Sequence, residues 1–146
     1  MNWILTVFLI GFLALISVTD ITKQIIPDKA IGIAILVRVC YQFVTEDIAW
    51  KEWILFFLNG LVVAFPVLVF VLLIEKIRKQ ELMGGGDIKL LFVIGMYIGW
   101  EKNLIAFLIA CMIGIIAGII GMKKEGIYFP FGPSIALGTV ISMLMS

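Results

Sequence analysis

The uncharged run from Trp53 to Ile74 restricts the fold more strongly than any other feature of this sequence. The run is long enough to cross the hydrocarbon core of a membrane, for which an α-helix needs about 20 residues. The composition agrees, because 63% of the residues are hydrophobic and 14% are charged, whereas soluble domains carry roughly 25% charged residues. The mean hydropathy of +1.20 is correspondingly high. We therefore predict an all-α integral membrane protein, with residues 1–146 forming a single transmembrane domain.

Apolar runs separated by short polar segments predict a bundle of about six transmembrane helices. The predicted spans are Asn2–Thr19, Ala30–Val44, Trp53–Ile74, Ile88–Trp100, Leu104–Met122 and Phe131–Met145. The second, fourth and sixth spans are shorter than the usual lower limit of about 17 residues. We expect these spans to sit off-centre, to thin the bilayer locally or to include loop residues. The first run lacks the basic segment and the cleavage site of a signal peptide, so we expect it to be retained.

The distribution of Lys and Arg predicts how the chain is oriented in the membrane. The first, third and fifth loops, with their edges, hold most of these residues, namely Lys23, Lys29, Lys76, Arg78, Lys79, Lys89, Lys123 and Lys124. The loops on the opposite side hold Lys51 and Lys102. Because positive residues are retained inside, we expect the first, third and fifth loops to face the cytoplasm and both termini to lie outside, in a protein of the plasma membrane.

The residue types that are missing from the sequence exclude several classes of function. The sequence contains no histidine, which excludes a histidine-based catalytic triad and a His-ligated zinc centre. Its two cysteines, Cys40 and Cys111, lie inside apolar runs and form no C-x-x-C pair. We interpret them as small core residues rather than as a disulfide or a metal site. No basic stripe interleaved with aromatic residues is present, so we expect no nucleic-acid partner. We also expect neither a metal nor another cofactor.

A run of glycines leads directly into Asp87 at the start of the fourth span. Gly84 and Gly86 are expected to allow positive φ and the close approach of another backbone, and a helix N-terminus favours a nearby negative charge. Asp20 follows the first span on the same predicted side of the membrane. Either aspartate alone could simply mark the boundary with water. Ionisable groups at membrane depth are costly and usually functional, so the two together indicate a site.

Paired carboxyl groups have a chemistry that single ones lack. Two carboxyl groups a few ångströms apart do not both ionise easily, so their pKa values separate and belong to the pair. The ionised group can take a proton from water while the protonated partner donates its proton to a peptide carbonyl. This is the chemistry of aspartic proteases, which need neither a metal nor a covalent intermediate. Paired aspartates can also bind protons or cations, so a small transporter or channel is the alternative from another class.

Three segments carry a resemblance to a known family. They are Asp20–Asp28, with the pattern D-x6-P-D, Gly84–Lys89, reading GGGDIK, and Phe129–Gly138, reading FPFGPSIALG. These segments resemble the signature regions of the type IV prepilin peptidases. That family consists of membrane aspartyl proteases of the GxGD type, which are more distantly similar to presenilin and the preflagellin peptidases. The resemblance covers essentially the whole chain in motif order and span count.

The resemblance implies a membrane aspartyl endopeptidase. Asp20 and Asp87 match the family's catalytic pair, Gly84 and Gly86 match the glycines of GxGD, and Lys89 matches a frequent lysine two places after the aspartate. The implied substrate is a prepilin or pseudopilin, whose short basic leader ends in glycine and precedes a hydrophobic helix in the lipid bilayer. Cleavage would take place at the cytoplasmic face. A third interpretation is a catalytically silent subunit of a pilus assembly machine.

The segment between the first two predicted spans departs from the longer members of the family. Bifunctional members carry a cytoplasmic insertion after the first span, often with paired C-x-x-C motifs, and also methylate the new N-terminus. Here only a short segment lies between Thr19 and Ala30, and it holds no C-x-x-C. We therefore expect a short, peptidase-only form, similar to the peptidases that serve tight-adherence pili.

Four further residues are candidates for shaping the site or supporting the spans. Pro27 is expected to fix a turn before the second span, and Asp28 is expected to cap that helix. Direct contact of these two residues with the substrate is the alternative. Lys89 is expected to lower the pKa of Asp87, to contact a substrate carbonyl or to extend its ammonium group toward water. Arg38 lies inside the second span, where an unpaired cation is costly, so we expect it to reach outward or to pair with Glu46.

Overall fold

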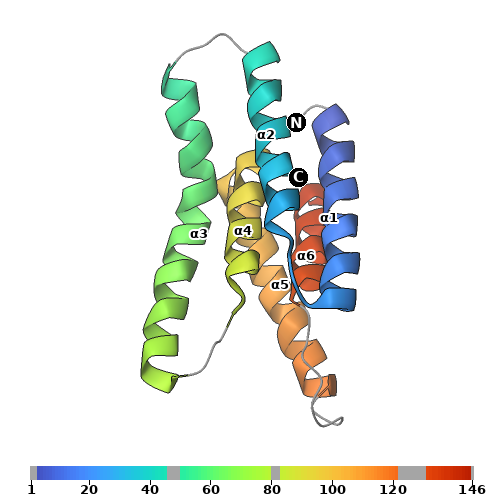
Figure 1. The fold of residues 1–146 in the computed structure, drawn as a ribbon, viewed down its shortest axis with the longest axis vertical. Helices are drawn as coiled ribbons and strands as arrows, with labels where there is room; N and C mark the ends of the chain where they lie inside the picture. Colours follow the sequence, from blue (N-terminus) through green and yellow to red (C-terminus); the bar gives the residue numbers. More distant parts are fainter. Residues whose placement is uncertain (1–2, 46–49, 80–82, 122–130, 146) are drawn as a thin grey trace.

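The computed structural model describes residues 3–45, 50–79, 83–121 and 131–145, and these residues form six α-helices and no strand. The helices are α1 (Trp3–Lys23), α2 (Asp28–Thr45), α3 (Trp50–Arg78), α4 (Gly85–Ile98), α5 (Trp100–Gly121) and α6 (Gly132–Leu144). Successive helices run in opposite directions along the bundle, so that α1, α3 and α5 run downward and α2, α4 and α6 run upward in Figure 1. The prediction of an all-α membrane protein is confirmed.

The helices differ in their capacity to cross a bilayer. Within the described residues, three segments are long and apolar enough to do so, namely Trp3–Lys23, Trp50–Ile77 and Trp100–Ala117. Helices α4 and α6 have only 14 and 13 residues, as their short apolar runs predicted. Many large apolar side chains of α1, α3 and α5 are exposed, which is the surface that a helix presents to lipid. The protein is therefore an integral membrane protein.

Helix α4 lies at the centre of the bundle. It packs against α2, α3, α5 and α6, and in Figure 1 it lies between α3 on one side and α1 with α6 on the other. Its side chains Leu90, Leu91, Val93 and Ile94 are completely buried. The ring of Tyr97 stacks on Phe8 of α1. Because α4 has neighbours on all sides, the position of its first turn is set by several other helices.

Small residues let neighbouring helices approach closely. A Cβ atom at Gly95 of α4 would lie 2.5 Å from the carbonyl oxygen of Asn59 in α3, so the two backbones are in direct contact. Nearby, the buried Asn103 of α5 donates a hydrogen bond of 2.9 Å to the Leu91 carbonyl of α4. These contacts fix α4 between α3 and α5.

The turn between α4 and α5 is shorter than the sequence predicted. The polar residues 101–103 were expected to separate the fourth and fifth spans, but α5 already begins at Trp100. Gly99 alone makes the turn, with φ of 85°, a conformation that glycine adopts at no steric cost. Its N–H donates to the Gly95 carbonyl at 3.0 Å. The polar residues therefore occupy the first turn of a helix rather than a loop.

Candidate active site

Asp20 lies in the last turn of α1 and is held by the N-terminus of α6. Its side chain is 5% exposed, and its Oδ2 accepts a hydrogen bond of 2.8 Å from the backbone N–H of Gly132. The first N–H groups of a helix have no partner inside the helix, and the helix dipole favours a negative charge at that point. The carboxyl group of Asp20 therefore serves as a cap for α6, supplied by a different helix.

Gly132 leaves just enough room for this contact. A Cβ atom built at Gly132 would lie 2.7 Å from Asp20 Oδ2 and 3.2 Å from Asp20 Cγ, so a larger residue would displace the carboxyl group. Pro133 follows in the first turn of α6, where its missing N–H costs nothing. The segment Phe129–Gly138, which carries part of the family resemblance, therefore borders the site through Gly132. Its first two residues lie outside the described part of the chain.

Asp87 lies in the first turn of α4 and is also only 5% exposed. Its N–H donates to the Gly84 carbonyl at 3.0 Å, which closes the first turn of the helix. A Cβ at Gly84 would lie 3.6 Å from Asp87 Oδ2, so the carboxyl group folds back over the glycine. Gly84 precedes the helix and carries no side chain that could cap it.

The expected backbone conformation of the glycine run is wrong. Gly84 is extended, with φ of −62° and ψ of 136°, and Gly86 lies within the helix. Neither residue uses the positive φ that glycine permits. Gly86 is needed for space instead, because a Cβ there would lie 2.9 Å from the Cβ of Ile26 in the connection between α1 and α2. A close approach is therefore present, but it is made by a side chain rather than by another backbone, and the predicted φ is absent.

The two carboxyl groups lie at the same end of the bundle. Helix α1 ends and α4 begins at the lower end in Figure 1, and Asp87 is close enough to Asp20 for the two groups to interact electrostatically. Helix α6 packs against both α1 and α4, and its N-terminus holds Asp20. The structure therefore brings together two buried carboxyl groups that are far apart in the sequence.

Lys89 and Asp28 form an ion pair beside this site. Lys89 Nζ lies 2.6 Å from Asp28 Oδ1, and the two side chains are 54% and 74% exposed. The pair connects α4 to the start of α2, so both predicted residues lie at the exposed rim of the bundle end that holds the carboxyl pair. Asp28 does not cap α2 as expected. The residue before the helix is Pro27, whose carbonyl accepts the N–H groups of Ala30 and Ile31.

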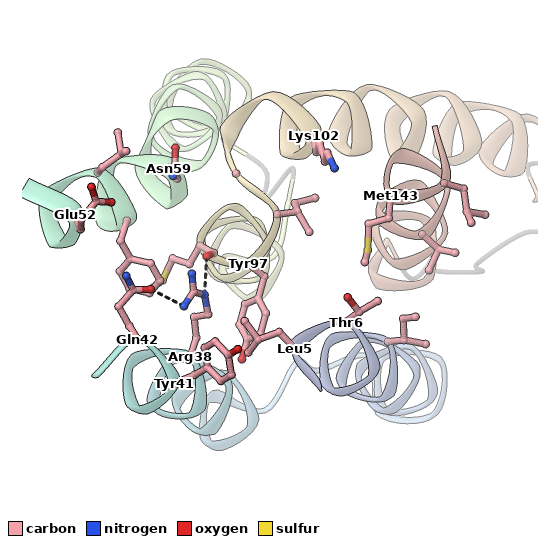
Figure 2. Close-up of a pocket in the computed structure, with 18 residues that line it drawn as sticks. Leu5, Thr6, Arg38, Tyr41, Gln42, Glu52, Asn59, Tyr97, Lys102 and Met143 are labelled. Carbon is pink, nitrogen blue, oxygen red and sulfur yellow. Dashed lines mark hydrogen bonds between the residues drawn. The ribbon is translucent and has the colours of Figure 1, made fainter. Parts of the chain in front are cut away.

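A polar cavity of about 730 Å³ lies at the opposite end of the bundle (Figure 2). Arg38 points into it, and its Nε donates to the Met96 carbonyl of α4 at 3.2 Å. One terminal nitrogen of Arg38 donates to Gln42 Oε1 at 2.7 Å, and the guanidinium lies 4.8 Å from the ring centre of Phe56 in α3. Arg38 therefore joins α2, α3 and α4. Its expected partner Glu46 lies outside the described residues.

Comparison with known proteins gives the family. Residues 7–119 match the type IV leader peptidase family. This chain belongs to that family, and the prediction from the three sequence segments is confirmed. The matched range includes both Asp20 and Asp87, so the carboxyl pair is the candidate site of this family member. Within the described residues, no cluster of three or more His, Cys, Asp or Glu side chains could hold a metal ion.

Curated relatives are similar along nearly the whole chain. The chain is 27% identical to a prepilin leader peptidase/N-methyltransferase of Stutzerimonas stutzeri, covering 92% of this chain and 46% of the relative. It is 28% identical to one of Bacillus subtilis, covering 94% and 54%, and 25% identical to one of Pectobacterium carotovorum, covering 94% and 50%. The chain thus spans about half the length of these relatives. No solved structure matches significantly.

Proposed function

We propose that this family member is a membrane aspartyl endopeptidase that removes the basic leader peptide from prepilin-like precursors. The observation that carries the proposal is that two buried carboxyl groups, Asp20 and Asp87, lie at one end of the bundle, within range of an electrostatic interaction. Ionisable groups buried in a membrane protein are costly unless they have a function. The names of the curated relatives support the same substrate class, a prepilin with a leader peptide.

The proposed reaction needs one ionised and one protonated carboxyl group. The ionised group takes a proton from a water molecule, whose oxygen attacks the carbonyl carbon of the scissile peptide bond. The protonated partner gives its proton to the carbonyl oxygen, and a tetrahedral intermediate forms. The group that took the proton from water then gives it to the amide nitrogen, and the C–N bond breaks. One hydroxyl group of the intermediate returns its proton to the other aspartate, and the leader leaves with a new carboxyl end. The hydrogen bond from Gly132 orients Asp20 for these transfers.

We propose that the site faces the cytoplasm. The helix ends around the two aspartates carry most of the basic residues in the described part of the chain, namely Lys23, Lys29, Lys76, Lys79 and Lys89. The opposite end carries Lys51 and Lys102 at the starts of α3 and α5. The positive-inside rule then places the aspartates at the cytoplasmic face of the plasma membrane, where the leader of a newly made precursor lies.

The proposal is tested by producing the protein together with a prepilin in cells that lack their own leader peptidase. The expected result is a shorter pilin whose mass and N-terminal sequence show one cut after the basic leader. A relative named as a prepilin leader peptidase, tested in the same cells, serves as the positive control. An uncut precursor with this protein, beside a cut precursor with the relative, would contradict the proposed activity on that substrate.

Gly86→Ala is expected to reduce leader cleavage by about tenfold or more, which is ~1.4 kcal/mol of barrier. The new Cβ would lie 2.9 Å from Ile26 Cβ, so the connection after Asp20 must shift away from α4. The matched control is Gly85→Ala, because a Cβ at Gly85 has no atom within 4 Å. The measurement compares the initial rates of precursor cleavage by the two variants, and Gly86→Ala is expected to be the slower one. Equal rates would show that the contact between Gly86 and Ile26 does not position the pair.

Removing the ion pair at the rim is expected to have a small effect. Lys89→Met and Asp28→Asn should each lower cleavage by no more than about fivefold, since exposed pairs contribute roughly 0–1 kcal/mol. Exchanging the two charges, with Lys89→Asp and Asp28→Lys in one protein, should restore part of the loss at low salt. The measurement is kcat/KM for the precursor. A hundredfold loss that the exchange does not restore would indicate that Lys89 contacts the substrate instead.

A further inference from the structure

An apolar groove leads away from Asp87 along the bundle. It is a cavity of about 680 Å³ where α3, α4 and α5 meet, and Gly84 and Asp87 form part of its wall. Helix α3 lines it from Val62 to Val71 and α5 lines it from Leu104 to Cys111. At 1.5 Å per residue, the α3 wall is roughly 13 Å long. The groove is therefore elongated along the helices.

The groove runs in a defined direction from the carboxyl pair. Helices α3 and α5 both run downward in Figure 1, toward the end that holds Asp20 and Asp87. Val62 and Leu104 therefore lie at the end of the groove that points away from this end of the bundle, and Val71 and Cys111 lie at its other end. Except for Asp87 and the thiol of Cys111, the lining side chains carry no ionisable group. A groove of this kind suits an apolar segment that begins at the carboxyl pair and continues into the membrane.

Two further cavities in the described part of the chain do not fit such a segment. One of about 310 Å³ lies on the other side of α4, between α2 and α3, and includes Lys89 but neither Asp20 nor Asp87. The polar cavity around Arg38 lies at the far end of α4 (Figure 2). Of these cavities, only the groove is lined by a member of the carboxyl pair.

We propose that this groove binds the hydrophobic helix that follows the cleavage site of the precursor. The inference rests on the proposed peptidase function and adds where the substrate lies. The scissile bond then lies beside Asp87, and the leader stays at the end of the bundle that holds the carboxyl pair. The hydrophobic helix runs from there between α3 and α5 toward Val62. The precursor reaches the groove sideways from the lipid, since its helix already lies in the bilayer. An acyl chain of a lipid is the competing occupant.

Cys111 makes the groove accessible to a direct contact experiment. It lines the groove and its side chain is partly exposed, while Cys40 lies on α2, outside the residues that line the groove. In a protein carrying Cys40→Ser and Asp20→Asn, which keeps the precursor uncut, single cysteines are placed along the helix of a cysteine-free prepilin. Mild oxidation should form disulfides to Cys111 from positions three or four residues apart, on one helical face.

The control for that experiment uses the cavity on the other side of α4. Leu68→Cys places a thiol in the wall of the 310 Å³ cavity, in a protein that also carries Cys111→Ser. Disulfides through Leu68→Cys, with none through Cys111, would overturn the proposal. The proposal would also be overturned if no prepilin position reacted with Cys111, a result that would leave lipid as the occupant of the groove. Because this readout needs no cleavage, it is independent of the proposed activity.

A pair of tryptophan substitutions on α3 tests the groove by kinetics. Val67→Trp fills the groove, whereas Val69→Trp adds the same bulk at a position that is 40% exposed and lines no part of the groove. Val67→Trp should lower kcat/KM for the precursor about tenfold, and Val69→Trp should leave it within twofold of the original protein. A wild-type rate with Val67→Trp would overturn the proposal that the groove binds the precursor helix, while leaving the peptidase proposal intact. Uncut precursor with the unmodified protein would instead contradict the peptidase.

Discussion

Replacing Asp87 by Asn is expected to abolish leader cleavage, and Asp20→Asn is expected to do the same. An amide cannot take a proton from water or give one to a peptide carbonyl, and general acid–base catalysis contributes about 100-fold to 10,000-fold to the rate. The shape of the side chain is kept. At position 20, the amide oxygen can still accept the hydrogen bond from the Gly132 N–H. Both variants should therefore fold, insert into the membrane and bind the precursor without cutting it.

The measurement for this prediction is the fraction of a co-produced prepilin that is cut, with equal amounts of each variant in the membrane. Asp28→Asn is the matched control, because Asp28 lies at the same end of the bundle but is 74% exposed and paired only at the rim. It should lose no more than about fivefold in activity. Full cleavage by Asp20→Asn or Asp87→Asn would show that the two carboxyl groups are not the reacting pair.

Gly132→Ala is expected to reduce cleavage by at least about tenfold, although the alanine is far milder than a change at either aspartate. The added Cβ would lie 2.7 Å from Asp20 Oδ2, a distance that forces the carboxyl group to move. Asp20 would then lose its hydrogen bond to the N-terminus of α6 and the position that this bond gives it. Overpacking of this kind typically costs about 1–3 kcal/mol, so stability should fall as well.

Measuring both activity and thermal stability distinguishes displacement of the Asp20 carboxyl group from a general loss of stability in Gly132→Ala. Gly32→Ala on α2 is the control, since a Cβ at Gly32 has no atom within 4 Å. Rates of precursor cleavage are compared with the temperature at which each purified protein loses its helical signal. We expect Gly132→Ala to remain folded at the assay temperature and to cut slowly. If it cut at the original rate, the contact of Asp20 with α6 would not be needed for the reaction.

The helices could be predicted from the sequence because each apolar run has few interpretations. The run Trp53–Ile74 lies within α3, and the structure extends the helix through the charged residues up to Arg78. The convergence of Asp20 and Asp87 also followed from the sequence, since both residues lie at ends of spans that face the same side. These features depend on local composition and on the alternating direction of successive spans.

The contacts that hold the site depend on residues that are far apart in the chain. Nothing near Asp20 in the sequence indicates that its partner is the N–H of Gly132, more than a hundred residues later. A backbone donor leaves no trace in the residue type, and the only signal was the Gly-Pro pair at the start of the last span. The identity of the neighbour of Gly86 could not be predicted for the same reason, because a glycine indicates that something approaches closely without indicating that it is Ile26.

The contacts of Arg38 could not be predicted either. Its partners are a backbone carbonyl on α4, Gln42 on its own helix and the ring of Phe56 on α3. A cation within a span signals that some partner exists. It does not say which of the neighbouring helices supplies that partner, because this depends on how the helices pack.

The most direct test of the proposed peptidase uses the purified protein in liposomes that also contain a prepilin. The wild type is compared with a double variant carrying Asp20→Asn and Asp87→Asn, and both precursor cleavage and proton flux are recorded. We predict that only the wild type cuts the precursor and that the two proteins give the same flux. An intact precursor, together with a flux that requires the two aspartates, would contradict the peptidase and support a transporter.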